Sequence, residues 1–292
     1  MTTSSTSSAS LPPIDGDTRW VAIVADPVAQ VQSPRLFNAF FASHGVPAAL
    51  LPAHVHGTDL GAVLDGLKRI RNLAGVVITV PHKIEALRFA RRLSPRAQAI
   101  GSINCLRRTA DGEWEGDNFD GEGFVCGLDR QGHAIAGATA LLVGAAGGAG
   151  IALADALARR GIVRLDLHDL RRDALAALIE RLARRFPRVA FRAAEPAAAP
   201  AHALLINASP AGMRTADAIP IALADAAPGA VVADLIMKPE RTALLADAQA
   251  RGLRTHAGRH LLENAVEPIA AFLGLHPQAA LQAARETAAP AS

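Results

Sequence analysis

The stretch that decides the fold is L-L-V-G-A-A-G-G-A-G, from Leu141 to Gly150. The apolar run predicts a strand at residues 140–144, and the small residues after it open a helix at residues 150–160. With Ala145 in the first glycine slot, the spacing fits a nucleotide-binding strand–turn–helix. Such a turn offers backbone N–H groups and a helix dipole to a pyrophosphate. We therefore expect a dinucleotide site formed by Gly144, Ala145, Ala146, Gly147, Gly148, Ala149 and Gly150.

The choice of dinucleotide depends on the residues after the next predicted strand, 163–168. Asp169 lies 19 residues after Gly150, where a carboxylate would bind the adenosine ribose 2′-hydroxyl and repel a 2′-phosphate. Arg171 and Arg172 stand close by and offer the opposite possibility, since guanidinium groups bind phosphate. The expected cofactor is NAD or NADP, with NAD slightly favoured.

The bulk composition narrows the class of protein. At 292 residues, half of them hydrophobic, the chain can form two ordinary domains. The net charge of +3 is scattered, so no nucleic-acid partner is expected, and no metal-binding pattern is present. Cys105 and Cys126 suit a reducing cytoplasm. We expect residues 1–17 to be a disordered tail, and the uncharged residues 134–154 to be a soluble Ala/Gly-rich turn region rather than a membrane span.

Short apolar runs alternate with helical stretches along the chain, which predicts an α/β fold with parallel sheets covered by helices. Ser33 is the expected N-cap of the first helix, and a break between two domains is expected near residues 121–137. The further strands expected are 20–25, 48–52, 75–80, 103–107, 114–116, 189–193, 203–207 and 230–235. The further helices expected are 34–44, 59–72, 84–93, 121–130, 173–185, 242–251, 261–273 and 278–287.

Two segments of the first half carry candidate catalytic groups. G-V-V-I-T-V-P-H-K, from Gly75 to Lys83, ends a buried strand at a proline and places a lysine before a helix. Lysine is rare in this arginine-rich chain, and an amine can release a proton where a guanidinium cannot. G-D-N-F-D-G, residues 116–121, places Asp120 between a strand and a helix. Alone, the first segment is equally consistent with a surface lysine, and the second is more typical of an ordinary turn than of a functional site.

Taken in order, these segments resemble the shikimate dehydrogenase family. The matching segments span residues 20 to 275 and are Q-V-Q-S-P (30–34), V-I-T-V-P-H-K (77–83), S-I-N (102–104), G-D-N-F-D-G (116–121), the glycine turn (144–150), N-A-S-P-A-G-M (207–213), D-L-I-M-K-P (234–239) and H-L-L-E-N (260–264).

The resemblance implies an N-terminal α/β substrate-binding domain (18–122 plus 262–290) and a Rossmann-type NAD(P)-binding domain (123–261), with the C-terminal helices returning to the first domain. It implies a cytoplasmic enzyme of aromatic amino acid biosynthesis, a monomer or homodimer, that oxidises a ring alcohol of shikimate or quinate. Lys83 and Asp120 would be catalytic. The implied substrate contacts are Ser33, Thr79, Asn104 and Asn264, and the further cofactor contacts are Asn207, Ser209 and Met213.

Departures from the family pattern gather on the substrate side. Val31 replaces a serine, Val77 an asparagine, Phe119 a threonine and Met237 a tyrosine. Loss of hydrogen-bond partners changes substrate discrimination, so the same chemistry on another cyclic hydroxy acid or amino analogue is an alternative. A non-catalytic NAD(P)-binding sensor and a folate-type dehydrogenase are further alternatives. The Lys–Asp pair argues against the sensor, and the G-D-N-F-D-G run argues against the folate enzyme.

Overall fold

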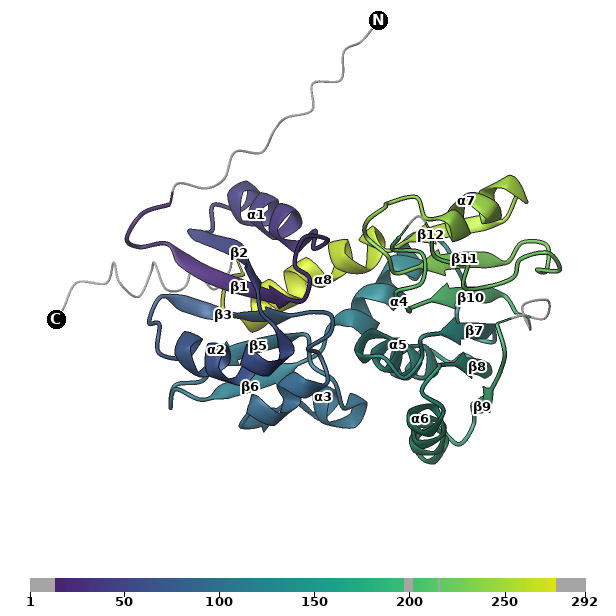
Figure 1. The fold of residues 1–292 in the computed structure, drawn as a ribbon, viewed down its shortest axis with the longest axis horizontal. Helices are drawn as coiled ribbons and strands as arrows, with labels where there is room; N and C mark the ends of the chain where they lie inside the picture. The colour runs from purple at the N-terminus through teal and green to yellow at the C-terminus, as the bar shows by residue number, and fades with distance from the viewer. Residues whose placement is uncertain (1–13, 197–201, 215, 277–292) are drawn as a thin grey trace, which may run out of the picture.

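The protein folds around two six-stranded sheets that lie side by side (Figure 1). The structure is a computed structural model and describes residues 14–276 except 197–201 and 215. The helix expected at 278–287 and most of the expected tail at 1–17 lie outside these residues. None of the described helices is long and apolar enough to cross a membrane.

The first sheet is mixed. Its order is β2-β1-β3-β5-β6-β4, with β1, β2 and β3 parallel and β5 antiparallel to both of its neighbours. All six residues of β3 are buried, as its β-branched run predicts. The strands are β1 (Arg19–Ala25), β2 (Ala48–His54), β3 (Leu73–Ile78), β4 (Arg92–Leu93), β5 (Cys105–Arg108) and β6 (Trp114–Asp117).

The second sheet is wholly parallel, in the order β12-β11-β10-β7-β8-β9. Its strand order reverses between β7 and β10, and ligands bind at such a reversal in doubly wound sheets. The strands are β7 (Thr139–Val143), β8 (Arg164–His168), β9 (Ala190–Ala193), β10 (Leu204–Asn207), β11 (Val231–Asp234) and β12 (Arg254–Ala257).

Helices cover both faces of each sheet (Figure 1). On the first sheet, α1 (Ser33–Ser43) and α8 (Arg259–Phe272) pack on one face, and α2 (Leu60–Leu67) packs on the other with the 3₁₀ turn η2 (Glu85–Phe89). A second 3₁₀ turn, η1 (Gly57–Asp59), directly precedes α2. On the second sheet, α7 (Ala243–Ala250) covers one face. The opposite face carries α4 (Asp120–Arg130), α5 (Gly148–Arg159) and α6 (Arg172–Arg185).

The chain crosses between the sheets twice. Helix α4 leads from β6 to β7, and α8 returns from β12 to pack beneath the first sheet (Figure 1). Within α8, Leu261 belongs to the core of the second sheet, whereas Leu262 and Ile269 belong to the core of the first. The α/β class, the Rossmann-type second domain and the C-terminal return are therefore confirmed.

Several local predictions are wrong. The first sheet is not parallel throughout, because β5 and β6 form a hairpin. Gln32, not Ser33, is the N-cap of α1, and no side chain caps this helix. The helix expected at 59–72 ends at Leu67, since Arg108 takes the carbonyls of Lys68 and Ile70.

The helix expected at 84–93 is replaced by η2 and β4, because the N–H groups of Arg91 and Ser94 bond to carbonyls on β6. Two further elements were also not expected from the sequence. One is β12, and the other is α3 (Pro95–Ile100), which Ser94 caps by accepting the N–H of Ala97.

Candidate active site

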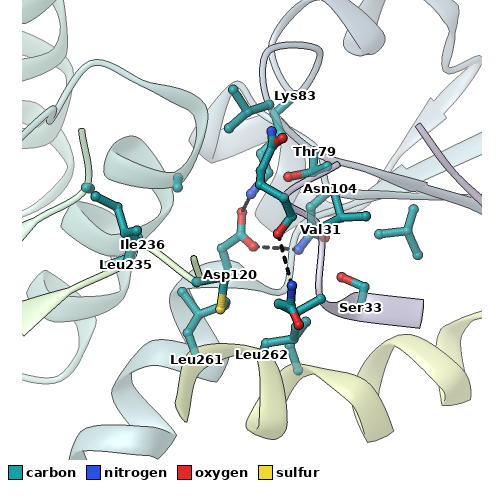
Figure 2. A pocket seen from close by; sticks show the side chains of 18 of the residues that line it. Val31, Ser33, Thr79, Lys83, Asn104, Asp120, Leu235, Ile236, Leu261 and Leu262 are labelled. Carbon is teal, nitrogen blue, oxygen red and sulfur yellow. Dashed lines mark hydrogen bonds and ion pairs between the residues drawn. The ribbon is translucent and has the colours of Figure 1, made fainter. Parts of the chain in front are cut away.

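Lys83 and Asp120 meet at the edge of the first sheet that faces the second. Lys83 follows the end of β3 by five residues, and Asp120 is the first residue of α4. Lys83 Nζ donates to Asp120 Oδ2 at 2.6 Å, and the side chains are only 12% and 6% exposed. Asn104 Nδ2 donates to the other oxygen, Asp120 Oδ1, at 2.9 Å (Figure 2). The structure thus brings three predicted residues into direct contact.

The G-D-N-F-D-G turn holds Asp120 rigidly. Asn118 is fully buried, and its Oδ1 accepts the backbone N–H of Asp120 at 3.0 Å. Asn104 Oδ1 accepts the N–H of Phe119 at 3.0 Å, so one amide fixes both the turn and the carboxylate. Every one of these buried polar groups is paired, which keeps the carboxylate in one orientation.

A cavity of about 190 Å³ opens in front of the pair. Ser33 and Thr79, two predicted substrate contacts, line it (Figure 2). Ser33 Oγ makes no hydrogen bond to any described residue, so its hydroxyl is free to meet a ligand. The remaining lining residues include Gln30, Val31, Gln32, Val77, Asn104, Ala149, Ser209, Met213, Leu235, Ile236, Met237, Lys238, Leu261, Leu262, Ala265 and Ile269.

Asn264, the fourth predicted substrate contact, lies elsewhere. On α8 the residues that face the cavity are Leu261, Leu262, Ala265 and Ile269. Asn264 Nδ2 instead donates to the carbonyl of His260 at 2.6 Å, one turn earlier. The structure therefore does not bring Asn264 to the cavity, and Asn264 is not proposed as a substrate contact.

The glycine turn between β7 and α5 has the backbone that a pyrophosphate requires. Gly144 has a φ of +78°, and a Cβ there would lie 2.6 Å from the nitrogen of Ser209. A Cβ on Gly150 would lie 2.2 Å from the carbonyl oxygen of Gly144. The N-terminus of the twelve-residue helix α5 therefore stays open to an anion, as the fingerprint predicts, and the residues fit a dinucleotide.

This turn touches the catalytic pair directly. Ser102 Oγ donates to the carbonyl of Gly148 at 3.0 Å and accepts from Asn118 Nδ2 at 3.3 Å. A Cβ on Gly148 would lie 2.7 Å from the Cβ of Lys83. The predicted pyrophosphate turn is therefore bonded, through Ser102 and Asn118, to the turn that carries Asp120.

Asp169 follows β8, as expected, but both of its carboxylate oxygens already accept hydrogen bonds from the chain itself. Its Oδ2 accepts the N–H of Ala146 at 2.9 Å, and Oδ1 accepts the N–H of Arg171 at 2.9 Å. Burial opposes ionisation of Asp169, but the bonds from Arg171 and Ala146 hold its carboxyl pKa below the usual value. The Arg171 guanidinium pairs with Asp169 at 3.2 Å while remaining 56% exposed, whereas Arg172 pairs with Glu195.

The strand ends of β10 and β11 form the far wall of the cavity. Asn207 is fully buried and accepts from Ser209 N and Oγ at 3.0 and 2.6 Å. It therefore positions the segment with Ser209 and Met213 rather than lining the cavity itself. Asn207 Nδ2 in turn donates to Asp234 Oδ1 at 3.1 Å.

Sequence reasoning did not single out three residues of this site: Ser102, Asp234 and Lys238. Burial raises the pKa of the Asp234 carboxyl to about 6, against hydrogen bonds from Thr242, Ile236 and Asn207 that lower it. Lys238 lies on the cavity wall. The scarcity of lysine in the chain could have identified Lys238, because two of the three lysines line this one cavity.

A Rossmann-type sheet whose glycine turn abuts a buried Lys–Asp pair defines a nicotinamide-dependent oxidoreductase with two domains. The comparisons with known proteins agree. The sequence profile of the shikimate dehydrogenase substrate binding domain matches residues 23–106. The shikimate dehydrogenase (NADP(+)) of Acidiphilium cryptum is 37% identical over 266 residues, which cover 90% of this chain and 94% of that protein. That of Rubrobacter xylanophilus is 35% identical over 92% of this chain and 95% of that protein.

Solved structures show the same architecture. Shikimate 5-dehydrogenase from Thermus thermophilus, in complex with NADP(H) and shikimate, is 28% identical. It aligns with a TM-score of 0.76 over 92% of this chain and 99% of that chain. The chain belongs to the shikimate dehydrogenase family and is an NAD(P)-dependent oxidoreductase. The family resemblance found in the sequence is thereby confirmed.

Proposed function

We propose that the protein is a shikimate dehydrogenase that interconverts a ring secondary alcohol and a ketone, with Lys83 and Asp120 as its catalytic residues. The observation that carries the proposal is the 2.6 Å contact between Lys83 Nζ and Asp120 Oδ2 at the cavity, directly beside the glycine turn. Relatives that share 35–37% of its sequence are NADP(+)-dependent shikimate dehydrogenases.

In the oxidation direction the ring carbon loses a hydride and the hydroxyl loses a proton. A nicotinamide cofactor held at the glycine turn, residues 144–150, would supply the hydride acceptor for this oxidation and the hydride donor for the reduction. Lys83 and Asp120 receive the hydroxyl proton as one coupled unit, and they give it back to the ketone oxygen in the reverse reaction. Asn104 holds the carboxylate in place, since it donates to Asp120 Oδ1. The apolar wall of Leu261, Leu262 and Ile269 excludes water from the reacting carbon.

Lys238 supplies the charge that the substrate's carboxylate needs. Lys83 and Asp120 neutralise each other, so Lys238 is the one lining residue whose charge has no ion-pair partner among the described residues. A carboxylate held by Lys238 and the free hydroxyl of Ser33 would compensate for the family serine that Val31 replaces.

The cofactor preference depends on the Asp169–Arg171 pair. Asp169 alone favours NAD, which was the slight preference from the sequence. Arg171 offsets that charge and remains exposed beside the glycine turn, so it can receive a 2′-phosphate. We propose that the enzyme uses both cofactors and that Arg171 confers its activity with NADP. A cytoplasmic location is proposed too, because both cysteines are free thiols.

A second candidate is the same oxidation of a less hydroxylated cyclic acid. The observation that favours it is the run of apolar side chains, Val31, Val77 and Met237, on the walls of the cavity. The hydroxyl groups of a polyol would find no hydrogen-bond partner on these walls. The site would then lose its selectivity for a highly hydroxylated substrate over a less hydroxylated one.

The test is a spectrophotometric assay of the purified protein with shikimate and quinate, each with NAD and with NADP. The proposal expects reduced cofactor to form with shikimate, and expects Lys83→Ala to abolish this signal. Lys68→Ala is the matched control, since Lys68 pairs with Glu113 outside the cavity. Cofactor binding without turnover on either acid would refute the shikimate proposal. Turnover of a less hydroxylated acid would then support the second candidate.

A further inference from the structure

We propose a second ligand site, for a phosphate-bearing small anion, in a cleft at the edge of the first sheet opposite the active site. Its walls come from the start of β1 and β3, the end of β5 and the end of α8, whereas the catalytic pair lies beyond the end of β3. The cleft measures about 480 Å³. It is named here the arginine cleft, after the lining residues Arg19, Arg71, Arg92, Arg107 and Arg108.

The charges of the arginine cleft do not balance. Arg107 pairs with Glu115 at 2.8 Å, and Arg92 pairs with Asp111 at 3.0 Å. The other three arginines, at positions 19, 71 and 108, have no carboxylate within 4.0 Å among the described residues. Like charges held this closely repel each other, so a bound anion would relieve the repulsion.

Two of these unbalanced guanidinium groups are held in fixed positions. Arg19 Nη1 donates to the carbonyl of Gly274 at 3.1 Å. Arg108 donates to the carbonyls of Lys68, Ile70 and Arg71 at 3.0–3.2 Å. Burial lowers the pKa of the Arg19 guanidinium, and the charge of Arg108 lowers it further. The bonds to neutral carbonyls cap helix and turn ends, but they cancel none of the positive charge. The arrangement is therefore pre-organised for an anion.

The residue type and the size of the cleft indicate the class of ligand. Guanidinium groups bind phosphate through paired N–H donors, and three unbalanced charges suit a dianion better than a single carboxylate. The cleft exceeds what inorganic phosphate fills, since a ligand pocket of roughly 300–1,000 Å³ accommodates a small organic molecule. Phe272, over which the Arg107 guanidinium lies at 4.6 Å, gives the cleft one apolar side. A phosphorylated metabolite of a few carbons matches both features.

Arg71 offers a clean test, because it is exposed and its side chain makes no bond to any described residue. Arg69, two residues earlier, is also exposed but does not line the cleft, so Arg69→Glu is the matched control for Arg71→Glu. Binding of glycerol 3-phosphate and of inorganic phosphate is measured by calorimetry at constant ionic strength. The protein is first saturated with NADP so that the glycine turn is occupied.

The proposal expects saturable binding to the wild type and to Arg69→Glu. It expects at least about tenfold weaker binding to Arg71→Glu, since one charge near a dianion is reversed. Tighter binding of glycerol 3-phosphate than of phosphate would identify an organic ligand, and the reverse order would identify the free ion. Equal binding to both variants, or no saturable binding to the wild type, would overturn the proposal.

Discussion

The active site has a nucleotide side, formed by the glycine turn, and a substrate side, formed by the cavity walls. The two sides depend on different features of the chain. On the nucleotide side the decisive features are backbone ones, the φ of Gly144 and the close approach at Gly150. On the substrate side they are side chains, and several of these differ from the family pattern, as at Val31 and Met237. A backbone requirement admits few residue types, whereas a pocket wall can be rebuilt from many. We therefore expect the two sides to respond differently to mutation.

Asp120→Ala should produce the largest effect and should separate the two sides. Removal of the carboxylate leaves Lys83 and Asn104 without their partner, so kcat should fall by about a thousandfold. Steady-state kinetics checks this, and NADPH fluorescence should give an unchanged Kd. A large loss of cofactor affinity would show that the two sides are not independent.

Asp234→Asn tests, by the pH dependence of stability, the cavity wall that the ends of β10 and β11 form. The folded pKa of Asp234 is about 6, above its unfolded value, so its contribution to stability is fully present below roughly pH 4 and is lost as pH rises to about 6. Replacement by Asn should remove this part of the pH dependence, about 3 kcal/mol at most. Urea unfolding of both proteins between pH 4 and 7 measures the difference. Identical pH profiles would contradict the raised pKa.

Lys238→Ala tests the substrate side. Loss of a charged hydrogen bond to the carboxylate should raise KM for the acid by about tenfold or more and leave cofactor KM unchanged. A rise in the cofactor KM instead would place Lys238 on the nucleotide side. Lys238→Arg keeps the charge and should recover part of the loss.

Arg171→Ala should change the cofactor preference without affecting the acid. We expect kcat/KM with NADP to fall by about tenfold, since a charged bond to the 2′-phosphate is lost, and kcat/KM with NAD to change little. Arg172→Ala is the control, because Arg172 pairs with Glu195. Equal losses with both cofactors would contradict a role for Arg171 in phosphate recognition.

Ser102→Ala should have the smallest effect. It tests whether the two sides are independent, because Ser102 connects the glycine turn with the turn that carries Asp120. Loss of its bond to the Gly148 carbonyl should raise the cofactor KM by roughly three- to tenfold. Ser102→Thr retains the hydroxyl and serves as the rescue variant. An unchanged cofactor KM in Ser102→Ala would show that the bond is only structural.

The sequence missed one strand in each sheet, β4 in the first and β12 in the second, but its prediction of parallel strands holds for the whole second sheet and only for part of the first. Parallel strands in a βαβ series are buried on both faces, so runs such as 203–207 and 230–235 are continuous and easily read. The helix at 84–93 and the end of α2 were predicted wrongly because partners far along the chain, β6 and Arg108, override local helical preference.

The candidate site, too, could be predicted only where a single segment of sequence identifies its residues. Lys83, Asn104 and Asp120 were identified by their segments, and the structure brings them together. Asn264, expected as a substrate contact, is not among the residues that line the cavity, and its amide donates back to the carbonyl of His260. Ser102 and the arginine cleft depend on contacts between distant segments, which no single stretch of sequence reveals.

The double crossing of the chain by α4 and α8 bears on how the molecule unfolds. Each sheet shares a hydrophobic core with at least one of these helices. In α8, Leu261 belongs to the core of the second sheet, and its neighbour Leu262 belongs to the core of the first. Melting one sheet would expose apolar surface that supports the other. Cooperativity of this kind predicts one calorimetric transition for the two domains instead of two separate ones.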